Sequence, residues 1–128
     1  MTPETSDYLG KAREDLDDAA KIAKIGIAKV AARCAYYAAF HAAEAFIFEN
    51  TGRVGKTHSG VRAEFARLAK ATPQVDRDFP KFLAKAYIYK EISDYGAPAG
   101  AGVSLSDAMD AITTATRFVD CMDKLLSA

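Results

Sequence analysis

The sequence predicts an all-α fold: a bundle of four long helices with a short extra helix. Two observations support this fold class. Apolar residues recur at helical spacing in successive segments, and no strand-like alternation, internal repeat or domain linker interrupts them. The chain has 128 residues, 50% of them hydrophobic and 27% charged, which is a typical globular composition. We therefore expect one helical domain over residues 1–128.

The first helix is expected from Pro3 to about Lys24. Thr2 is a good N-cap residue, Pro3 suits the first helical position, and Glu4 places an acid in the first turn. Gly26 is expected to break the chain soon after the helix ends.

The second helix is predicted over residues 27–50 and is the most apolar part of the sequence. Alanine fills most of its remaining positions beside a wide apolar surface formed by Val30, Tyr37, Phe40, Ala43, Phe46 and Ile47. Such a helix is expected to be buried on most sides, either by the rest of the bundle or by a second subunit. Gly52 is expected to end it.

Three further helices follow from cap residues and prolines. One is expected to start at Thr57 or Ser59, run to about Ala71 and end before Pro73. The next spans residues 78–95, and the glycine-rich segment 96–102 is expected to form a loop. Ser104 and Asp107 resemble a capping box that starts the last helix.

The overall composition excludes several classes of protein. Lys plus Arg and Asp plus Glu both number 17, so non-specific coating of nucleic acid or membrane is not expected. Charged residues interrupt the apolar stretch 25–48, and the polar N-terminus does not resemble a secretory signal. Cys34 and Cys121 are expected to be reduced thiols in a cytoplasmic protein. Since no phosphate-loop, zinc or serine-nucleophile motif is present, we expect neither a cofactor nor a metal.

The polar residues of the second helix form the first candidate site. Arg33, Tyr37 and His41 are four positions apart, so they are expected to share one helix face. An arginine can hold two phosphate oxygens, and a neutral histidine can accept a proton near physiological pH. In the alternative interpretation, His41 is a hydrogen-bonded core histidine and Arg33 pairs with an acid of a neighbouring helix.

A second candidate site lies at the start of the third helix. His58 follows Lys56 and Thr57, and Arg62 comes one turn later. Helix N-termini attract anions, so these four residues are candidate ligand-binding residues. This region contains five cations and a single acid, Glu64, and forms the one basic patch in the sequence. The cations are Arg53, Lys56, Arg62, Arg67 and Lys70. The alternative is an ordinary solvated face. Lys90 and Asp94, four apart, are expected to form a structural pair.

Three motifs resemble the HEPN domain family, and in particular its small stand-alone bacterial branch. They are residues 35–45, with Tyr36, Tyr37, Phe40 and His41; residues 56–61, Lys-Thr-His-Ser-Gly-Val; and residues 92–95, Ile-Ser-Asp-Tyr. The resemblance extends over nearly the whole chain.

The resemblance implies an antiparallel up-and-down four-helix bundle that commonly forms a homodimer. It also implies a minimal nucleotidyltransferase as partner in a toxin–antitoxin pair. Many members are metal-independent ribonucleases, in which an arginine is followed four to six residues later by a histidine. In this chain seven residues separate Arg33 from His41, and Cys34 occupies a position where the stand-alone branch often has arginine.

Three functions are therefore considered. The first is a non-catalytic module that binds RNA, a nucleotide or a nucleotidyltransferase partner. The second is a metal-independent ribonuclease, with His41 as general base and Arg33 as phosphate clamp. The third is a purely structural dimer subunit.

Overall fold

The computed structural model describes residues 1–99 and 102–127, and these residues form five α-helices and no strand. The helices are α1 (Pro3–Lys24), α2 (Ala28–Thr51), α3 (His58–Lys70), α4 (Asp78–Tyr95) and α5 (Leu105–Ser127). The all-α prediction is confirmed, and α3 is the shortest of the five. In the segment predicted as a loop, residues 100 and 101 lie outside the described residues.

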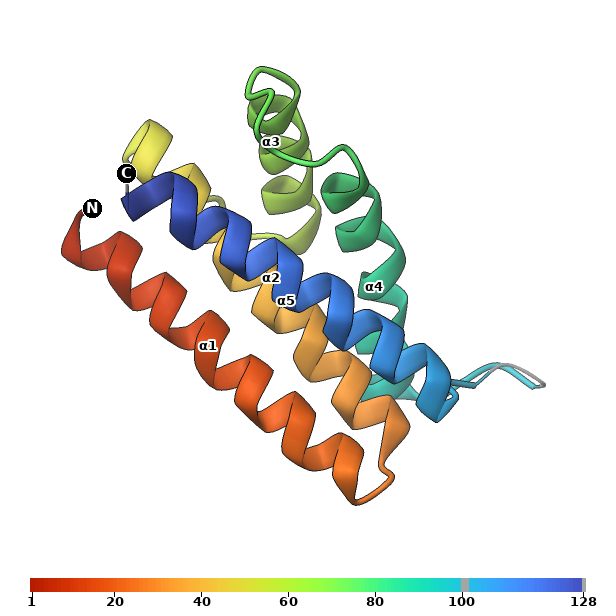
Figure 1. Ribbon diagram of the computed structural model, residues 1–128. Coiled ribbons are helices and arrows are strands. Elements are labelled where there is room, and N and C mark those ends of the chain that lie inside the picture. The colour runs from red at the N-terminus through yellow and green to blue at the C-terminus, as the bar shows by residue number, and fades with distance from the viewer. Residues whose placement is uncertain (100–101, 128) are drawn as a thin grey trace.

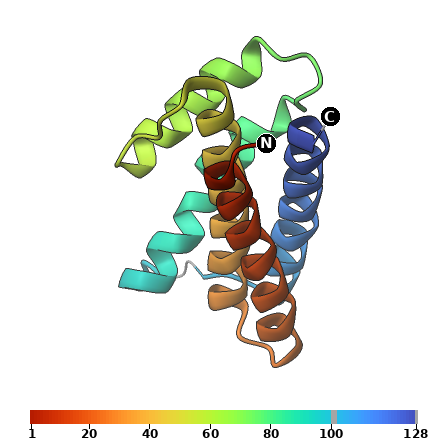
Figure 2. The same ribbon diagram turned by 90° about the vertical axis from the view of Figure 1, so that its left-hand side faces the viewer.

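Helix α2 lies in the middle of the molecule and contacts all four other helices. Figure 1 shows α1, α2 and α5 side by side, with α3 and α4 on the other side of α2. The quarter turn of Figure 2 shows the same order. Helices α1 and α4 run one way along the molecule, and α2 and α5 run the other way (Figure 1). This arrangement is compatible with the up-and-down bundle that the sequence predicts.

Small side chains explain how α2 is enclosed. Eight alanines of this helix are completely buried, and larger buried residues such as Phe46 and Ile47 lie among them. An alanine surface lets neighbouring backbones approach closely, so α1 and α5 both pack against α2. The predicted burial of the second helix is therefore confirmed within a single chain.

Aromatic rings connect the remaining helices to this centre. Phe65 of α3 lies between Phe46 of α2 and Phe118 of α5, with ring centres 5.7 and 5.0 Å away. Phe79 at the start of α4 packs against Phe118, with ring centres 4.8 Å apart. Rings of this size contribute much of a core's free energy, and here they hold α3 and α4 in fixed positions beside α2.

The predicted helix ends agree with the structure to within one or two residues. Thr2 caps α1 by accepting a hydrogen bond from the Thr5 amide. Ser104 and Asp107 exchange two hydrogen bonds, of 3.1 and 2.9 Å, which confirms the capping box. Gly52 ends α2 with a φ of 81°, a left-handed conformation that suits glycine.

Some large apolar side chains remain exposed on the helices. Ile88 and Tyr95 of α4 and Met109 of α5 have exposed fractions of 56%, 78% and 50%. Among the described residues, none of the helices combines the length and the hydropathy that crossing a lipid bilayer requires.

Candidate functional site

The three spaced polar residues of α2 form a continuous column. The Arg33 guanidinium lies over the Tyr37 ring, 4.7 Å from its centre, and the Tyr37 and His41 rings are 5.9 Å apart. The Arg33 and His41 side chains are 37% and 23% exposed, so the column lies at the surface rather than inside the core. The predicted shared face therefore agrees with the geometry.

Arg33 is already paired with an acid of another helix. Its Nε donates a 2.8 Å hydrogen bond to Asp94 on α4, and the Lys90 Nζ is 3.3 Å from the same carboxylate. Desolvation acts to raise the pKa of Asp94, but the hydrogen bonds from Arg33 and Lys90 outweigh it and leave this pKa below its ordinary value. An anionic ligand at Arg33 must therefore compete with Asp94. The expected Lys90–Asp94 pair is confirmed.

His41 lies between two carboxylates. Its Nδ1 is 2.7 Å from Glu44 Oε1, and its Nε2 is 3.6 Å from Asp15 Oδ2 on α1. Burial raises the pKa of Asp15, whose Oδ2 is buried and has no hydrogen-bond partner in the described part of the chain. Because a phosphate at His41 would meet both acids, this geometry favours an imidazole that joins α1 to α2.

His58 enters the site from α3. Its Nδ1 is 2.7 Å from the Tyr36 hydroxyl, and its ring is 4.6 Å from Phe40, 5.4 Å from Tyr87 and 5.8 Å from Tyr37. Burial, followed by the positive charges of Lys90 and Arg62, lowers the pKa of His58. The imidazole is therefore neutral near pH 7 and enclosed by aromatic rings.

Two cations lie against the Tyr87 ring. The Arg62 guanidinium lies 4.3 Å from the centre of the Tyr87 ring, and the Lys90 Nζ lies 5.8 Å from it. Burial raises the pKa of Tyr36, and the nearby Arg62 acts in the opposite direction. The Arg62 Nη1 is buried and has no hydrogen-bond partner among the described residues. A buried guanidinium N–H without an acceptor is costly, and an anion is the acceptor that it prefers.

These side chains form one group, which we call the cation–aromatic cluster. Its members come from α2, α3 and α4, and each lies within 6 Å of another by ring or charge centre: Arg33, Tyr37, His58, Arg62, Tyr87 and Lys90. The cluster brings together Arg33 and Tyr37 of the first predicted site with His58 and Arg62 of the second. His41 extends the same column beyond Tyr37.

The other residues predicted at the second site have different positions. The Thr57 hydroxyl accepts a hydrogen bond from the Gly60 amide at 3.0 Å and so caps α3. Lys56 is exposed in the preceding loop.

The predicted basic patch is divided between different faces of α3. Arg62 faces Tyr87, whereas Arg67 pairs with Glu64 at 2.6 Å and is largely exposed. Lys70 lines a separate pocket beside the α3–α4 connection. The cations of this segment therefore do not act as a single surface.

Sequence reasoning did not identify Tyr87 as part of the site and treated Lys90 only as a structural residue. A signal was present, because residues 87, 90 and 94 follow the i, i+3, i+7 spacing of one helix face. This spacing indicates a site only if α4 lies against α2, and local spacing does not specify how helices pack. No group of three or more His, Cys, Asp or Glu side chains in the described ranges is arranged to hold a metal ion.

Comparisons with known proteins agree with this architecture. Residues 5–125 match the sequence model of the HEPN domain. A UPF0332 protein of Thermotoga maritima is 31% identical over 116 residues, which cover 91% of this chain and 86% of that protein. A UPF0332 protein of Gloeobacter violaceus is 28% identical over 99% of both chains, and one of Archaeoglobus fulgidus is 36% identical over 69% of both. The chain belongs to the HEPN domain family.

Proposed function

We propose that this protein is a HEPN module that binds the phosphates of RNA or of a nucleotide through the cation–aromatic cluster. The main observation behind the proposal is that Arg33, Arg62 and Lys90 gather over the Tyr37 and Tyr87 rings. In the part of the chain that the structure describes, the Arg62 Nη1 also has no acceptor. Arginine and lysine hold phosphates, while aromatic faces stack on nucleobases. A cluster that combines both is suited to a nucleotide unit.

The proposal includes a cytoplasmic homodimer that folds as one up-and-down bundle over residues 1–128. Its partner in this proposal is a minimal nucleotidyltransferase, the second member of a toxin–antitoxin pair. The family resemblance supports this part, and the local charge of the cluster in a protein of zero net charge supports selective rather than general binding. Lys56, exposed beside the cluster, adds a further cation for a long ligand.

A second candidate function is a metal-independent ribonuclease. In the sequence-based form of this hypothesis, Arg33 is the phosphate clamp and His41 is the base. The geometry at His58 favours a different base, because this imidazole has a lowered pKa and lies in the same cluster as Arg62. A neutral imidazole beside a guanidinium has the chemistry needed to take a proton from a ribose hydroxyl and to stabilise the phosphorane.

A binding titration with two matched variants tests the first proposal. Arg62→Gln and Arg67→Gln each remove one arginine from α3, but only Arg62 belongs to the cluster. Fluorescence anisotropy with a short labelled RNA and with labelled ATP is expected to show affinity that falls with salt. Arg62→Gln is expected to weaken binding about tenfold, whereas Arg67→Gln leaves it nearly unchanged. Equal effects of both variants would contradict the proposal.

A cleavage assay separates the second function from the first. The wild type, His41→Ala and His58→Ala are incubated with the same RNA in the presence of EDTA. Cleavage that is lost only in His58→Ala supports the ribonuclease with His58 as base, and loss only in His41→Ala supports the sequence-based assignment. Binding without cleavage in all three supports the module. If the protein neither binds nor cleaves the RNA, the result supports the third hypothesis, a purely structural dimer subunit.

A further inference from the structure

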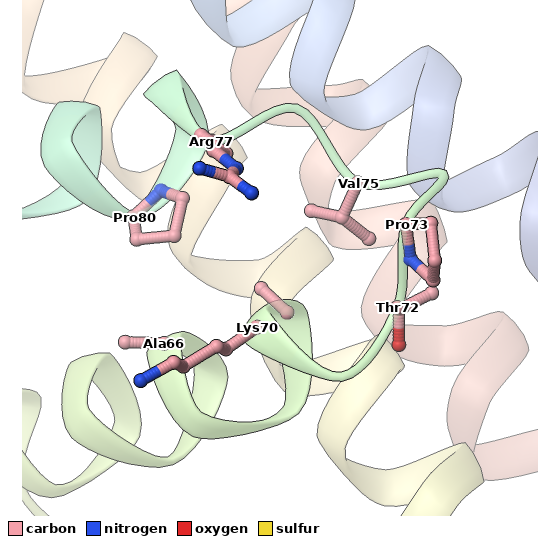
Figure 3. Close-up of a pocket in the computed structure, with 8 residues that line it drawn as sticks. Ala66, Lys70, Thr72, Pro73, Val75, Arg77 and Pro80 are labelled. Atoms are coloured by element: carbon pink, nitrogen blue, oxygen red, sulfur yellow. The ribbon is translucent and has the colours of Figure 1, made fainter.

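A pocket of about 450 Å³ lies where α3 ends and α4 begins, and none of its lining residues belongs to the cation–aromatic cluster. Figure 3 shows these residues around the α3–α4 connection. Small-molecule sites in proteins are typically concavities of about 300–1,000 Å³ with an apolar lining and a few polar groups. The volume of this pocket lies within that range.

Most of the lining is apolar and comes from short or rigid side chains. Ala66 of α3 lies along one side, and Val75 and Pro80 lie along the other (Figure 3). Ala69 of α3 also lines the pocket. Ala69 and Val75 are buried, at 8% and 4% exposed, so they belong to the core as well as to the pocket. Since few of these side chains can change shape, the apolar part of the pocket is largely preformed.

The rest of the lining consists of two cations, Lys70 and Arg77, together with Thr72 and Pro73. Lys70 extends past Ala66, and Arg77 turns its guanidinium between Val75 and Pro80 (Figure 3). Four other arginines lie within ion-pair distance of a carboxylate, namely Arg13, Arg33, Arg67 and Arg117. In the described part of the chain, neither Lys70 nor Arg77 has such a partner, and no acidic residue lines the pocket.

Asp76 and Asp78 flank Arg77 in the sequence, but among the described residues neither carboxylate lies within ion-pair distance of Arg77 or Lys70. Asp76 accepts a 2.8 Å hydrogen bond from the Asp78 amide through Oδ1 and a 3.0 Å bond from Arg117 Nη2 through Oδ2. Both oxygens of this carboxylate are therefore engaged, and it holds the α3–α4 connection against α5. An anion between Lys70 and Arg77 would therefore displace no carboxylate of residues 1–99 or 102–127.

We propose that this pocket binds a small amphipathic anion, a compact apolar body that carries one carboxylate or phosphate group. The apolar body lies against Ala66, Ala69 and Val75, and the anionic group lies between Lys70 and Arg77. The apolar side chains of Ala66, Ala69 and Val75 suit the apolar body, and the positive charges of Lys70 and Arg77 suit the anionic group. The inference is independent of RNA or nucleotide binding at the cluster.

Octanoate is the probe for this proposal, with octanol and acetate as its matched controls. Octanol keeps the apolar chain without the charge, and acetate keeps the charge with almost no chain. Titration of isotope-labelled protein is expected to shift the NMR signals of Ala66, Ala69 and Val75 with octanoate. Octanol and acetate are expected to bind at least about threefold more weakly. Shifts of equal midpoint with octanol, or shifts confined to other regions, would overturn the proposal.

Variants assign the anionic group to its partners. Lys70→Gln and Arg77→Gln are each expected to weaken octanoate binding about three- to tenfold and to leave octanol binding unchanged. Arg67→Gln in α3 and Lys81→Gln in the first turn of α4 are the controls, since each removes one charge close to the pocket from a residue that does not line it. If all four variants bind octanoate as the wild type does, the assignment is wrong. Displacement of octanoate by a phosphate monoester with the same alkyl chain is the result expected for a site that accepts both anions.

Discussion

At the scale of single residues, the charge of His58 follows from its neighbours. Burial and the positive charges of Lys90 and Arg62 lower the pKa of this imidazole, and its Nδ1 shares a 2.7 Å hydrogen bond with the Tyr36 hydroxyl. Both the stability and the chemistry of the cluster depend on this arrangement, in which Tyr36 is completely buried.

The lowered pKa of His58 predicts how stability changes with pH. An unfolded histidine binds a proton below about pH 6.5, whereas the folded His58 binds it only at lower pH. The free energy of unfolding contributed by this residue is therefore constant above pH 6.5 and falls as the pH drops from there to the folded pKa. Urea unfolding at pH 7.5 and 5.5 is expected to show a larger loss in the wild type than in His58→Gln. Equal losses would mean that His58 titrates as it does in the unfolded chain.

Removing the Tyr36 hydroxyl tests the same arrangement. Tyr36→Phe keeps the buried ring but leaves His58 Nδ1 without its partner, so we expect a loss of about 1–2 kcal/mol in the free energy of unfolding. Tyr95→Phe is the control, because Tyr95 is 78% exposed, and a change within about 0.5 kcal/mol is expected there. Chemical denaturation measures both. If Tyr36→Phe has the same free energy of unfolding as the wild type, the Tyr36 hydroxyl does not contribute to stability.

At the scale of helices, Thr57 has a structural role that its place beside Lys56 and His58 does not reveal. Its hydroxyl caps α3, and a Cβ on Gly60 would lie 2.8 Å from that oxygen. We expect Thr57→Ala to cost about 1 kcal/mol in unfolding free energy, while Thr57→Ser retains the cap. RNA or nucleotide binding is expected to survive in both. A tenfold loss of binding in Thr57→Ala at unchanged stability would instead assign the hydroxyl to the ligand.

The sequence predicted the helices well because their ends are marked by local signals. Thr2, Gly52 and the Ser104–Asp107 pair act within one turn of the chain, so spacing alone was sufficient. The site was predicted only in part, because Tyr87 and Lys90 join it through the packing of α4 against α2, which local spacing does not specify. The carboxylates around His41 come from two helices, and no pattern within α2 indicates that Asp15 of α1 lies beside it.

At the scale of the whole molecule, stability depends on the small residues of α2. Ala42 is completely buried in the helix that all the others contact. Ala42→Leu forces α2 and its neighbours apart, and we expect a loss of about 1–3 kcal/mol and a lower Tm. Ala20→Leu adds the same atoms at an exposed position of α1 and is expected to be nearly neutral. Thermal unfolding of both variants measures the difference. Similar Tm values for Ala42→Leu and Ala20→Leu would show that the side chains around Ala42 can rearrange to hold a leucine.

The first helix starts and the last helix ends at the same end of the molecule, as Figures 1 and 2 both show. The two termini are therefore near each other, and a short linker could join them without changing how the helices pack. All the residues of the cation–aromatic cluster fall in the uninterrupted segment from α2 to α4. A circular permutant that begins with α5 and joins it to α1 through a short linker keeps that segment whole. This permutant is expected to adopt the same fold, although its helices follow one another in a different order along the chain.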